Sequence, residues 1–312
     1  RENLSNKGNK MNQRRWQGIF SVLVTPFEKN AEINFDLFEV LIDKNIKNGA
    51  DGLIVCGSTG EFYTMSVEER IALFECCVKQ TSKRIPIIAG VSDLSMENCF
   101  ELSRQAEKAG CDGILALPPI YATPDLRETE HFYKTLTSHT KLPIMLYNSP
   151  KRTGVNLTPD FVHEISEIPQ ITAIKDSSGD IRQLNELCSR VKDKLSIFVG
   201  YETMIRSSFS IGCVGVVAMA HQLAGRLVRE YFDACKCGNH SLADRLEPAL
   251  FAIYACFQSG SFYSGIKAVM CELGQDVGGP RKPLLPFTST QLNHVRSILK
   301  TKNVKEIIEE LG

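Results

Sequence analysis

The sequence lacks a net charge, a long apolar segment and a signal-peptide core. Its 312 residues carry 36 basic and 36 acidic side chains, so the formal net charge is zero. A balanced chain has no global field that would attract nucleic acid or an anionic membrane. No apolar run reaches the ~18 residues that a membrane-spanning helix needs. We therefore expect a cytoplasmic protein that acts on small molecules, with neither nucleic-acid nor membrane partners.

Paired CxxC motifs are also missing, although cysteine itself is abundant. The eleven cysteines are odd in number and lie mostly in apolar periodic segments, as reduced core cysteines do. Cys235, Cys237 and His240 come closest to a metal cluster, but a single CxC with one histidine is typical of an ordinary helix end. We predict no metal site. Residues 1–11, which are polar, are predicted to be a disordered N-terminal segment or a vector remnant.

Eight short apolar runs recur along the chain, with starts roughly 20 to 35 residues apart. They cover residues 18–24, 51–57, 85–91, 112–118, 142–148, 171–175, 195–200 and 214–219. Between them lie amphipathic stretches with apolar residues at helical spacing and a glycine near the end, such as 35–50 and 95–110. Strand and helix alternating eight times predict an α/β protein, a (β/α)8 TIM barrel. A doubly wound open sheet is disfavoured, because no GxGxxG motif opens a helix after a strand.

The chain from about residue 222 to residue 312 reads as helical throughout. We assign residues 12–236 to the barrel and residues 237–312 to a C-terminal helical extension. No linker rich in serine or proline separates the two parts. The extension is therefore expected to pack on the barrel.

Lys175 ends the apolar run 171–175, which has the pattern of a strand buried on both faces. Its amine either reaches solvent along its own methylene groups or lies in a cleft at the strand end. In such a cleft the loss of water favours the neutral amine, which can attack a carbonyl. The residues at the ends of the other strands decide between these two interpretations of Lys175.

Active sites of (β/α)8 barrels lie at the C-terminal ends of the strands. This rule selects Thr25, Pro26, Gly57, Ser58, Thr59, Gly60, Glu61, Pro118, Pro119, Tyr121, Tyr147, Asn148, Pro150, Arg152, Lys175, Gly200 and Glu202. An amine next to a tyrosine and a hydroxyl-rich Gly-Ser-Thr-Gly turn supplies a nucleophile, a proton relay and donors for a carboxylate. Each piece alone has an ordinary structural explanation, but together they favour a site that forms a Schiff base.

Four segments carry a resemblance to a known family. "TPF" (25–27), "GSTGEFYTMSVEER" (57–70), "YNSPKRTGVNLTP" (147–159) and "AIKDSSGD" (173–180) resemble the pyruvate-dependent class I aldolases, the superfamily of dihydrodipicolinate synthase and N-acetylneuraminate lyase. The resemblance runs in order from Gly18 to about Leu285. It implies an enzyme that needs no cofactor and acts on pyruvate or another 2-oxo acid together with an aldehyde.

The resemblance also implies roles for single residues. Lys175 matches the lysine that forms the imine, and Tyr147 the tyrosine that shuttles protons. Ser58 and Thr59 match the pair that holds the pyruvyl carboxylate and links Tyr147 to a second tyrosine. Tyr121 matches that second tyrosine, which in the family reaches into the neighbouring subunit. A homotetramer made of two tight dimers is therefore expected.

Other positions bear on the substrate. Arg152 matches an arginine that the synthases use near the acceptor carboxylate, and a guanidinium suits bidentate carboxylate binding. Gly200 and Glu202, in "GYETM", stand where the lyases hold sugar hydroxyls, although Thr203 replaces one acid of their pattern. Both are expected to line the substrate site. Ser58 in place of threonine leans toward the lyases, and "SFYSGIK" (261–267) replaces the Asn-Pro-x-Pro-x-Lys segment of the synthases.

Arg152 and Tyr121 place dihydrodipicolinate synthase-like condensation of pyruvate with aspartate semialdehyde first among the possible activities. A 2-keto-3-deoxy sugar-acid or 4-hydroxy-2-oxoglutarate aldolase comes second, and N-acetylneuraminate lyase third. A non-catalytic module that binds 2-oxo acids is the alternative from another class. It is disfavoured, because a binder needs neither a neutral amine nor a proton relay.

Overall fold

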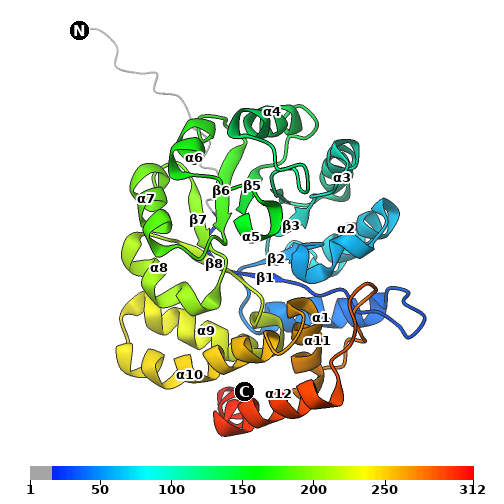
Figure 1. Cartoon of the computed structure of the whole chain (residues 1–312), viewed down its shortest axis with the longest axis vertical. Helices are drawn as coiled ribbons and strands as arrows, with labels where there is room; N and C mark the ends of the chain where they lie inside the picture. The colour runs from blue at the N-terminus through cyan, green and yellow to red at the C-terminus, as the bar shows by residue number, and fades with distance from the viewer. Residues whose placement is uncertain (1–15) are drawn as a thin grey trace.

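The computed structural model describes residues 16–312, and within this range eight parallel strands form a closed barrel surrounded by helices (Figure 1). The strands are β1 (Gly18–Val22), β2 (Gly52–Val55), β3 (Ile87–Gly90), β4 (Gly113–Ala116), β5 (Ile144–Asn148), β6 (Ile171–Asp176), β7 (Ser196–Val199) and β8 (Gly215–Ala218). Each strand pairs with the next one along the chain, and β1 closes the barrel on β8. The predicted (β/α)8 fold is confirmed, and each of the eight apolar runs forms a strand.

Helices follow the strands where the sequence places capping residues. They are α1 (Phe35–Lys47), α2 (Val67–Thr81), α3 (Met96–Ala109), α4 (Leu126–Leu136), α5 (Pro150–Thr153), α6 (Pro159–Ile165), α7 (Ile181–Val191), α8 (Ile205–Ile211), α9 (His221–Cys237), α10 (His240–Phe257), α11 (Phe262–Glu272), α12 (Ser289–Thr301) and α13 (Val304–Leu311). Ser66 and Glu69 form a capping box at the start of α2, and Gly110 ends α3 in the left-handed conformation. Within residues 16–312, no helix is both long and apolar enough to cross a membrane.

The prediction that the chain is helical throughout from about residue 222 to residue 312 is wrong at two places. Residues 273–288 lie outside any helix, between α11 and α12, and a second break falls at Asn303. Asn303 adopts φ +50°, in the left-handed region, and separates α12 from α13. Asparagine tolerates this conformation better than most residues, so the break needs neither glycine nor proline and escapes a pattern search. The prediction for residues 1–11 lies outside the described residues.

We propose that residues 237–312 form an extension of the barrel and not a separate domain. α10 packs on α9, α11 and α12, and α13 contacts both α9 and α10. In Figure 1 these helices, yellow to red, lie along one side of the barrel. The extension therefore has a fixed position against the strands, from which its side chains can reach the barrel mouth.

Aromatic rings fill the barrel interior below the strand ends. The rings of Phe20 on β1 and Phe198 on β7 meet edge to face, with centroids 5.0 Å apart, although β8 lies between their strands. Two neighbouring glycines leave room for them. A Cβ atom on Gly52 would come within 2.4 Å of the Phe20 ring, and one on Gly215 within 2.5 Å of the Phe198 ring. The barrel is thus a packed core and not a pore.

Gly215→Ala should destabilise the protein, because the added methyl group would meet both the Phe198 ring and the carbonyl oxygen of Gly18. Overpacking of this kind costs about 1–3 kcal/mol of the free energy of unfolding. The matched control is Gly279→Ala, since a Cβ there meets only Pro286 Cγ at 3.6 Å. Urea unfolding of both variants tests the prediction, and equal midpoints would contradict it.

Candidate active site

Lys175 and Tyr147 lie side by side at the C-terminal ends of β6 and β5, where they are register partners. The pairing depends on an irregularity in β6. The register shifts by one residue at Thr172, so Tyr147 pairs with Lys175 and not with Ile174. A single inserted residue in a strand re-aims the side chains that follow it. The bulge therefore brings the amine next to the tyrosine.

Both side chains are almost covered by protein: Lys175 is 5% exposed and Tyr147 is 7% exposed. The Lys175 Nζ atom lies 4.0 Å from the centroid of the Tyr147 ring. The Tyr147 hydroxyl shares hydrogen bonds with Lys175, Ser58 and Ser149. Burial opposes ionisation of Tyr147, but the charge and hydrogen bond of Lys175 and the two serine hydroxyls outweigh it and lower the pKa of Tyr147. A tyrosine that gives up its proton readily suits a proton relay.

The turn after β2 faces this pair. Ser58, Thr59 and Gly60 form one turn of 3₁₀ helix, which the left-handed residue Glu61 (φ +59°) terminates. The Thr25 hydroxyl donates a hydrogen bond of 2.7 Å to the carbonyl oxygen of Gly60 and so ties the turn to β1. The first N–H groups of a helical turn have no partner inside it. Together with the two hydroxyls, they offer several donors to one anion.

Arg152 lies on α5, which Figure 1 shows in front of the strand ends. Its guanidinium Cζ atom is 5.0 Å from the centroid of the Tyr263 ring on α11. Tyr263 also packs against Tyr63, with centroids 5.9 Å apart, and shares a hydrogen bond with Ser58. The sequence patterns did not single out Tyr263. Its position in "SFYSGIK", the segment that departs from the synthases, was the available signal.

Glu202 is not brought into the site, which corrects the expectation that its carboxylate lines the substrate. Glu202 is fully buried, and its carboxylate accepts hydrogen bonds from the Tyr254 hydroxyl and from the Ala220 amide. Burial raises the pKa of Glu202. Gly200 does lie at the strand end, where a Cβ atom would meet Ser177 Oγ at 1.9 Å. Glycine at this position leaves room for the Ser177 side chain.

Tyr121 does not join the other site residues within one chain. It lies on the loop between β4 and α4, its side chain is 91% exposed, and its φ of +74° is in the left-handed region. Met96, which is 39% exposed, lines a pocket together with Pro119 and Pro124 of this loop.

A polar pair just beyond Tyr147 and Lys175 fixes the ends of β5 and β6. Asn148 Nδ2 donates a hydrogen bond of 2.8 Å to the Asp176 carboxylate, and the same carboxylate accepts 2.6 Å and 3.1 Å hydrogen bonds from Ser178. Asn148 and Asp176 are register partners, one residue beyond Tyr147 and Lys175. They hold the two strand ends together where the chemistry requires a fixed distance.

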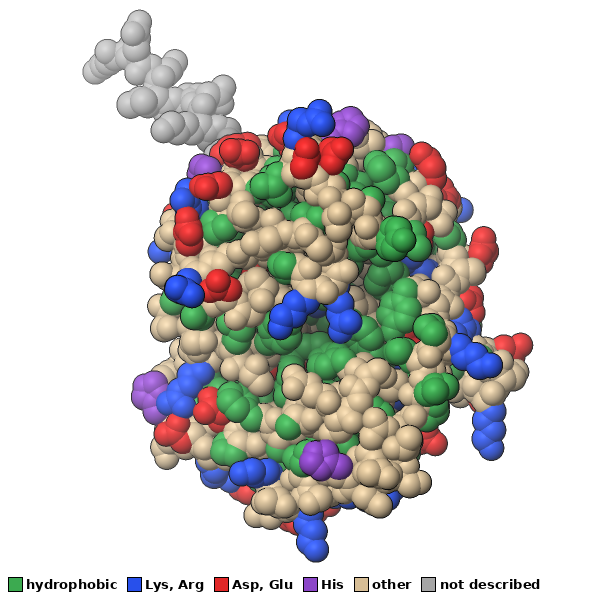
Figure 2. All heavy atoms as spheres, in the orientation of Figure 1, with side chains coloured by type: hydrophobic (Ala, Val, Ile, Leu, Met, Phe, Trp, Pro, Cys, Tyr) green, Lys and Arg blue, Asp and Glu red, His purple; other side chains and the backbone are tan. Residues whose placement is uncertain are grey.

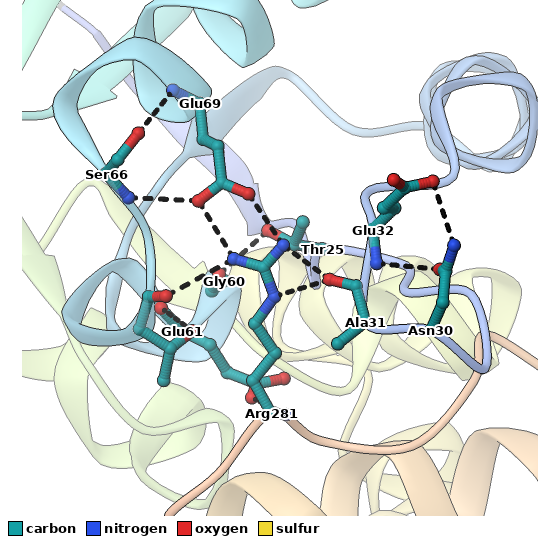
Figure 3. A network of polar contacts seen from close by, with 10 residues as sticks. Thr25, Asn30, Ala31, Glu32, Gly60, Glu61, Ser66, Glu69 and Arg281 are labelled. Atoms are coloured by element: carbon teal, nitrogen blue, oxygen red, sulfur yellow. Dashed lines mark hydrogen bonds and ion pairs between the residues drawn. The ribbon is translucent and has the colours of Figure 1, made fainter.

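A buried ion pair joins the turn after β2 to the C-terminal extension. Lys267 on α11 lies 2.7 Å from Glu61, and both side chains are at most 2% exposed. Glu61 also accepts a 2.9 Å hydrogen bond from the Arg281 amide. Figure 3 shows the Arg281 guanidinium between Glu69, to which it donates two hydrogen bonds, and the carbonyl oxygen of Ala31. Burial lowers the pKa of Lys267 although Glu61 opposes that shift.

The face that carries the strand ends has a basic and apolar character. In Figure 2 basic side chains gather near the middle of this face, with hydrophobic side chains around them. Among residues 16–312, no group of three His, Cys, Asp or Glu side chains could hold a metal ion. A buried amine next to a tyrosine and a hydroxyl-rich turn, all at the C-terminal end of a (β/α)8 barrel, are the features of a class I aldolase-type enzyme.

Comparisons with known proteins identify the family. A sequence model of the dihydrodipicolinate synthetase family matches residues 15–302, so the chain belongs to this family. The 4-hydroxy-tetrahydrodipicolinate synthase of Desulforamulus reducens is 34% identical over 282 residues, which cover 90% of this chain and 95% of that protein. The Bacillus subtilis enzyme of the same name is 31% identical over 274 residues, or 88% and 94% of the two chains. The crystal structure of a dihydrodipicolinate synthase from Bacillus anthracis superposes with a TM-score of 0.88 at 30% identity, and the match covers 91% and 98% of the two chains.

Lys267→Met should destabilise the protein by about 3–5 kcal/mol, because it leaves the Glu61 carboxylate buried without its cation. Adding Glu61→Gln should cost less than the sum of the two single effects, since the buried charge is then gone. Urea unfolding measures both.

The exposed pair of Arg245 and Glu310 supplies the control, because its side chains are 47% and 58% exposed. Arg245→Met should change the free energy of unfolding by about 0–1 kcal/mol. If Lys267→Met had an effect as small as that of Arg245→Met, the ion pair would not hold the extension.

Proposed function

We propose that the protein condenses pyruvate with aspartate semialdehyde through an imine on Lys175, which is the reaction of a 4-hydroxy-tetrahydrodipicolinate synthase. The observation that carries the proposal is the pairing of Lys175 with Tyr147 at the buried end of two neighbouring strands. The names of the relatives and the position of Arg152 at the mouth support the choice of acceptor.

The first step is formation of the imine. The Lys175 amine adds to C2 of pyruvate, and the resulting carbinolamine loses water to give an iminium. Tyr147 passes the proton that the attacking nitrogen loses to the new alkoxide, and a second proton, taken up from solvent, lets the hydroxyl leave as water. The pyruvyl carboxylate is assigned to the turn of Ser58 and Thr59.

The second step forms the carbon-carbon bond. The iminium draws electrons from the methyl group, which loses a proton to become an enamine. The enamine carbon then attacks the aldehyde carbon, and the new alkoxide takes up a proton. In the proposed reaction the amino group of the acceptor finally attacks C2 and displaces Lys175, which closes the ring and frees the enzyme.

The acceptor is assigned through Arg152. A guanidinium at the mouth favours an aldehyde that carries its own carboxylate, and the Tyr263 ring beneath it fixes its direction. An uncharged sugar aldehyde gains nothing comparable. Burial of Glu202 removes the group that would have held sugar hydroxyls, so N-acetylneuraminate lyase is disfavoured further.

A 2-keto-3-deoxy sugar-acid or 4-hydroxy-2-oxoglutarate aldolase is the second candidate. It would use the same imine in the direction of cleavage. The observation that favours it is the phenol of Tyr263 next to Ser58, since it adds a hydroxyl to the mouth of the site in a segment that differs from the synthases.

We also propose a homotetramer made of two tight dimers in the cytoplasm. The 91% exposed ring of Tyr121 supports an interface at this loop, because burial of its apolar surface would stabilise association. A cytoplasmic location is supported by the eleven cysteines, which are all free, including the neighbours Cys188 and Cys213 with sulfurs 3.7 Å apart.

Borohydride reduction in the presence of pyruvate should add a lactyl-type mass to the peptide that contains Lys175. Lys175→Ala should abolish the adduct, because the amine is the proposed nucleophile. Peptide mass spectrometry reads the position directly. Labelling of Lys267, which is also buried, or of Lys151 on α5 would overturn the assignment.

Arg152→Ala should raise the KM for aspartate semialdehyde by one to two decades, since a charge-assisted contact contributes roughly 1.5–3 kcal/mol. The KM for pyruvate should change less, because its carboxylate is assigned to the turn. Arg152→Lys should recover only part of the loss. If the wild-type protein ignores aspartate semialdehyde but cleaves a 2-keto-3-deoxy acid, and Arg152→Ala leaves that cleavage intact, the synthase assignment is wrong.

A further inference from the structure

The guanidinium of Arg152 lies over the ring of Tyr263 at the mouth of the site. Arg152 belongs to α5, a helix of only 4 residues, and its side chain is exposed. Among residues 16–312 the guanidinium has no ion-pair partner, and its Cζ atom lies 5.0 Å from the centroid of the Tyr263 ring. A guanidinium over a ring face uses none of its N–H donors for that contact. These donors therefore stay free for the carboxylate of a ligand.

The ring of Tyr263 is itself held in place by its neighbours. The rings of Tyr63 and Phe262 pack against it, with centroids 5.9 Å and 5.7 Å away. Helix α11, which carries Tyr263, also approaches α10 closely. A Cβ atom on Gly265 would come within 2.3 Å of the carbonyl oxygen of Phe257. The ring therefore has a fixed position on a helix that is tightly packed against the next one.

Lys267 ties the same helix to the turn after β2. It follows Tyr263 by one helical turn, so the two side chains share one face of α11. The Lys267 amine lies 2.7 Å from the carboxylate of Glu61, the residue that ends the turn of Ser58 and Thr59. Both members of this ion pair are buried. One rigid helix thus connects the turn assigned to the pyruvyl carboxylate with the arginine assigned to the acceptor carboxylate.

We propose that Tyr263 is a positioning residue that determines which acceptor the enzyme takes, because its ring holds Arg152 at a fixed distance from the turn. The proposal rests on the proposed function, in which Arg152 binds the acceptor carboxylate. It adds that the length of the acceptor is selected as well as its charge. The role belongs to the ring and not to the hydroxyl.

The selection of length follows from two fixed points. The nucleophilic carbon of the enamine is held by the bond to Lys175 and by the turn. The acceptor carboxylate is held by a guanidinium that cannot move freely. The aldehyde carbon then reaches the enamine only in an acceptor whose aldehyde and carboxylate are separated by one particular number of carbons. The favoured class is therefore a short aldehyde that ends in a carboxylate, with the spacing of aspartate semialdehyde.

The KM for aspartate semialdehyde tests the role of the ring. Tyr263→Leu removes the ring and lets the guanidinium move, so this KM should rise about 2- to 30-fold, the range expected when a cation–π contact is lost. The KM for pyruvate and the exchange of its methyl protons with deuterium oxide should change little, because neither needs the acceptor. Tyr263→Phe keeps the ring and should restore the wild-type KM. Equal losses in the two variants would assign the role to the hydroxyl and overturn the proposal.

Arg152→Ala supplies the matched background. If the ring acts through Arg152, adding Tyr263→Leu to Arg152→Ala should raise the KM for aspartate semialdehyde no further. A merely structural role of the ring would raise this KM in both backgrounds and would contradict the proposal. Borohydride trapping of pyruvate on Lys175 checks that each variant keeps a folded site.

Two competitors test the selection of length. Succinate semialdehyde has the carbon spacing of aspartate semialdehyde, and glutarate semialdehyde is longer by a single methylene group. The wild-type protein should bind succinate semialdehyde more tightly, and Tyr263→Leu should bring the two inhibition constants closer together, because a mobile guanidinium can follow either carboxylate. An unchanged ratio in Tyr263→Leu would overturn the proposal. Absence of pyruvate trapping or of aspartate semialdehyde turnover in the wild-type protein would instead overturn the proposed function.

Discussion

The register between β5 and β6 is the constraint on which the site depends. One extra residue at Thr172 sets Lys175 opposite Tyr147, and the hydrogen bond between Asn148 and Asp176 holds the strands together just beyond. Because side chains alternate along a strand, a shift of one residue would turn the amine to the other face of the sheet. The proposed formation of the imine uses the contact that this register creates.

The second element is the buried pair of Glu61 and Lys267. It connects the turn after β2 with the C-terminal extension, two segments that are far apart in the sequence. Burial of both charges disfavours them, so the pair is a weak source of stability but a specific one, because neither charge tolerates loss of the other. In this way a helix outside the eightfold repeat becomes part of the active site, and it brings Tyr263 with it.

Sequence patterns were sufficient for the barrel and for the residues at the strand ends, because both follow from local periodicity and from a rule about parallel sheets. They could not predict the bulge, since Thr172 is an ordinary strand residue. They could not predict Tyr263 either, because its position depends on an ion pair between distant segments. Glu202 is a residue that the sequence patterns wrongly assigned to the substrate site, because it is an acid directly after a strand. Its carboxylate instead accepts hydrogen bonds from Tyr254 and Ala220 inside the protein.

A crystal structure of the protein reduced with borohydride in the presence of pyruvate tests the central claim most directly. We predict continuous density from Lys175 Nζ to a lactyl group, with its carboxylate on the turn of Ser58 and Thr59. The Tyr147 hydroxyl should lie within hydrogen-bond distance, roughly 2.5–3.2 Å, of the nitrogen that joins Lys175 to the lactyl group. A lactyl group on another lysine, or a carboxylate bound away from this turn, would contradict the account.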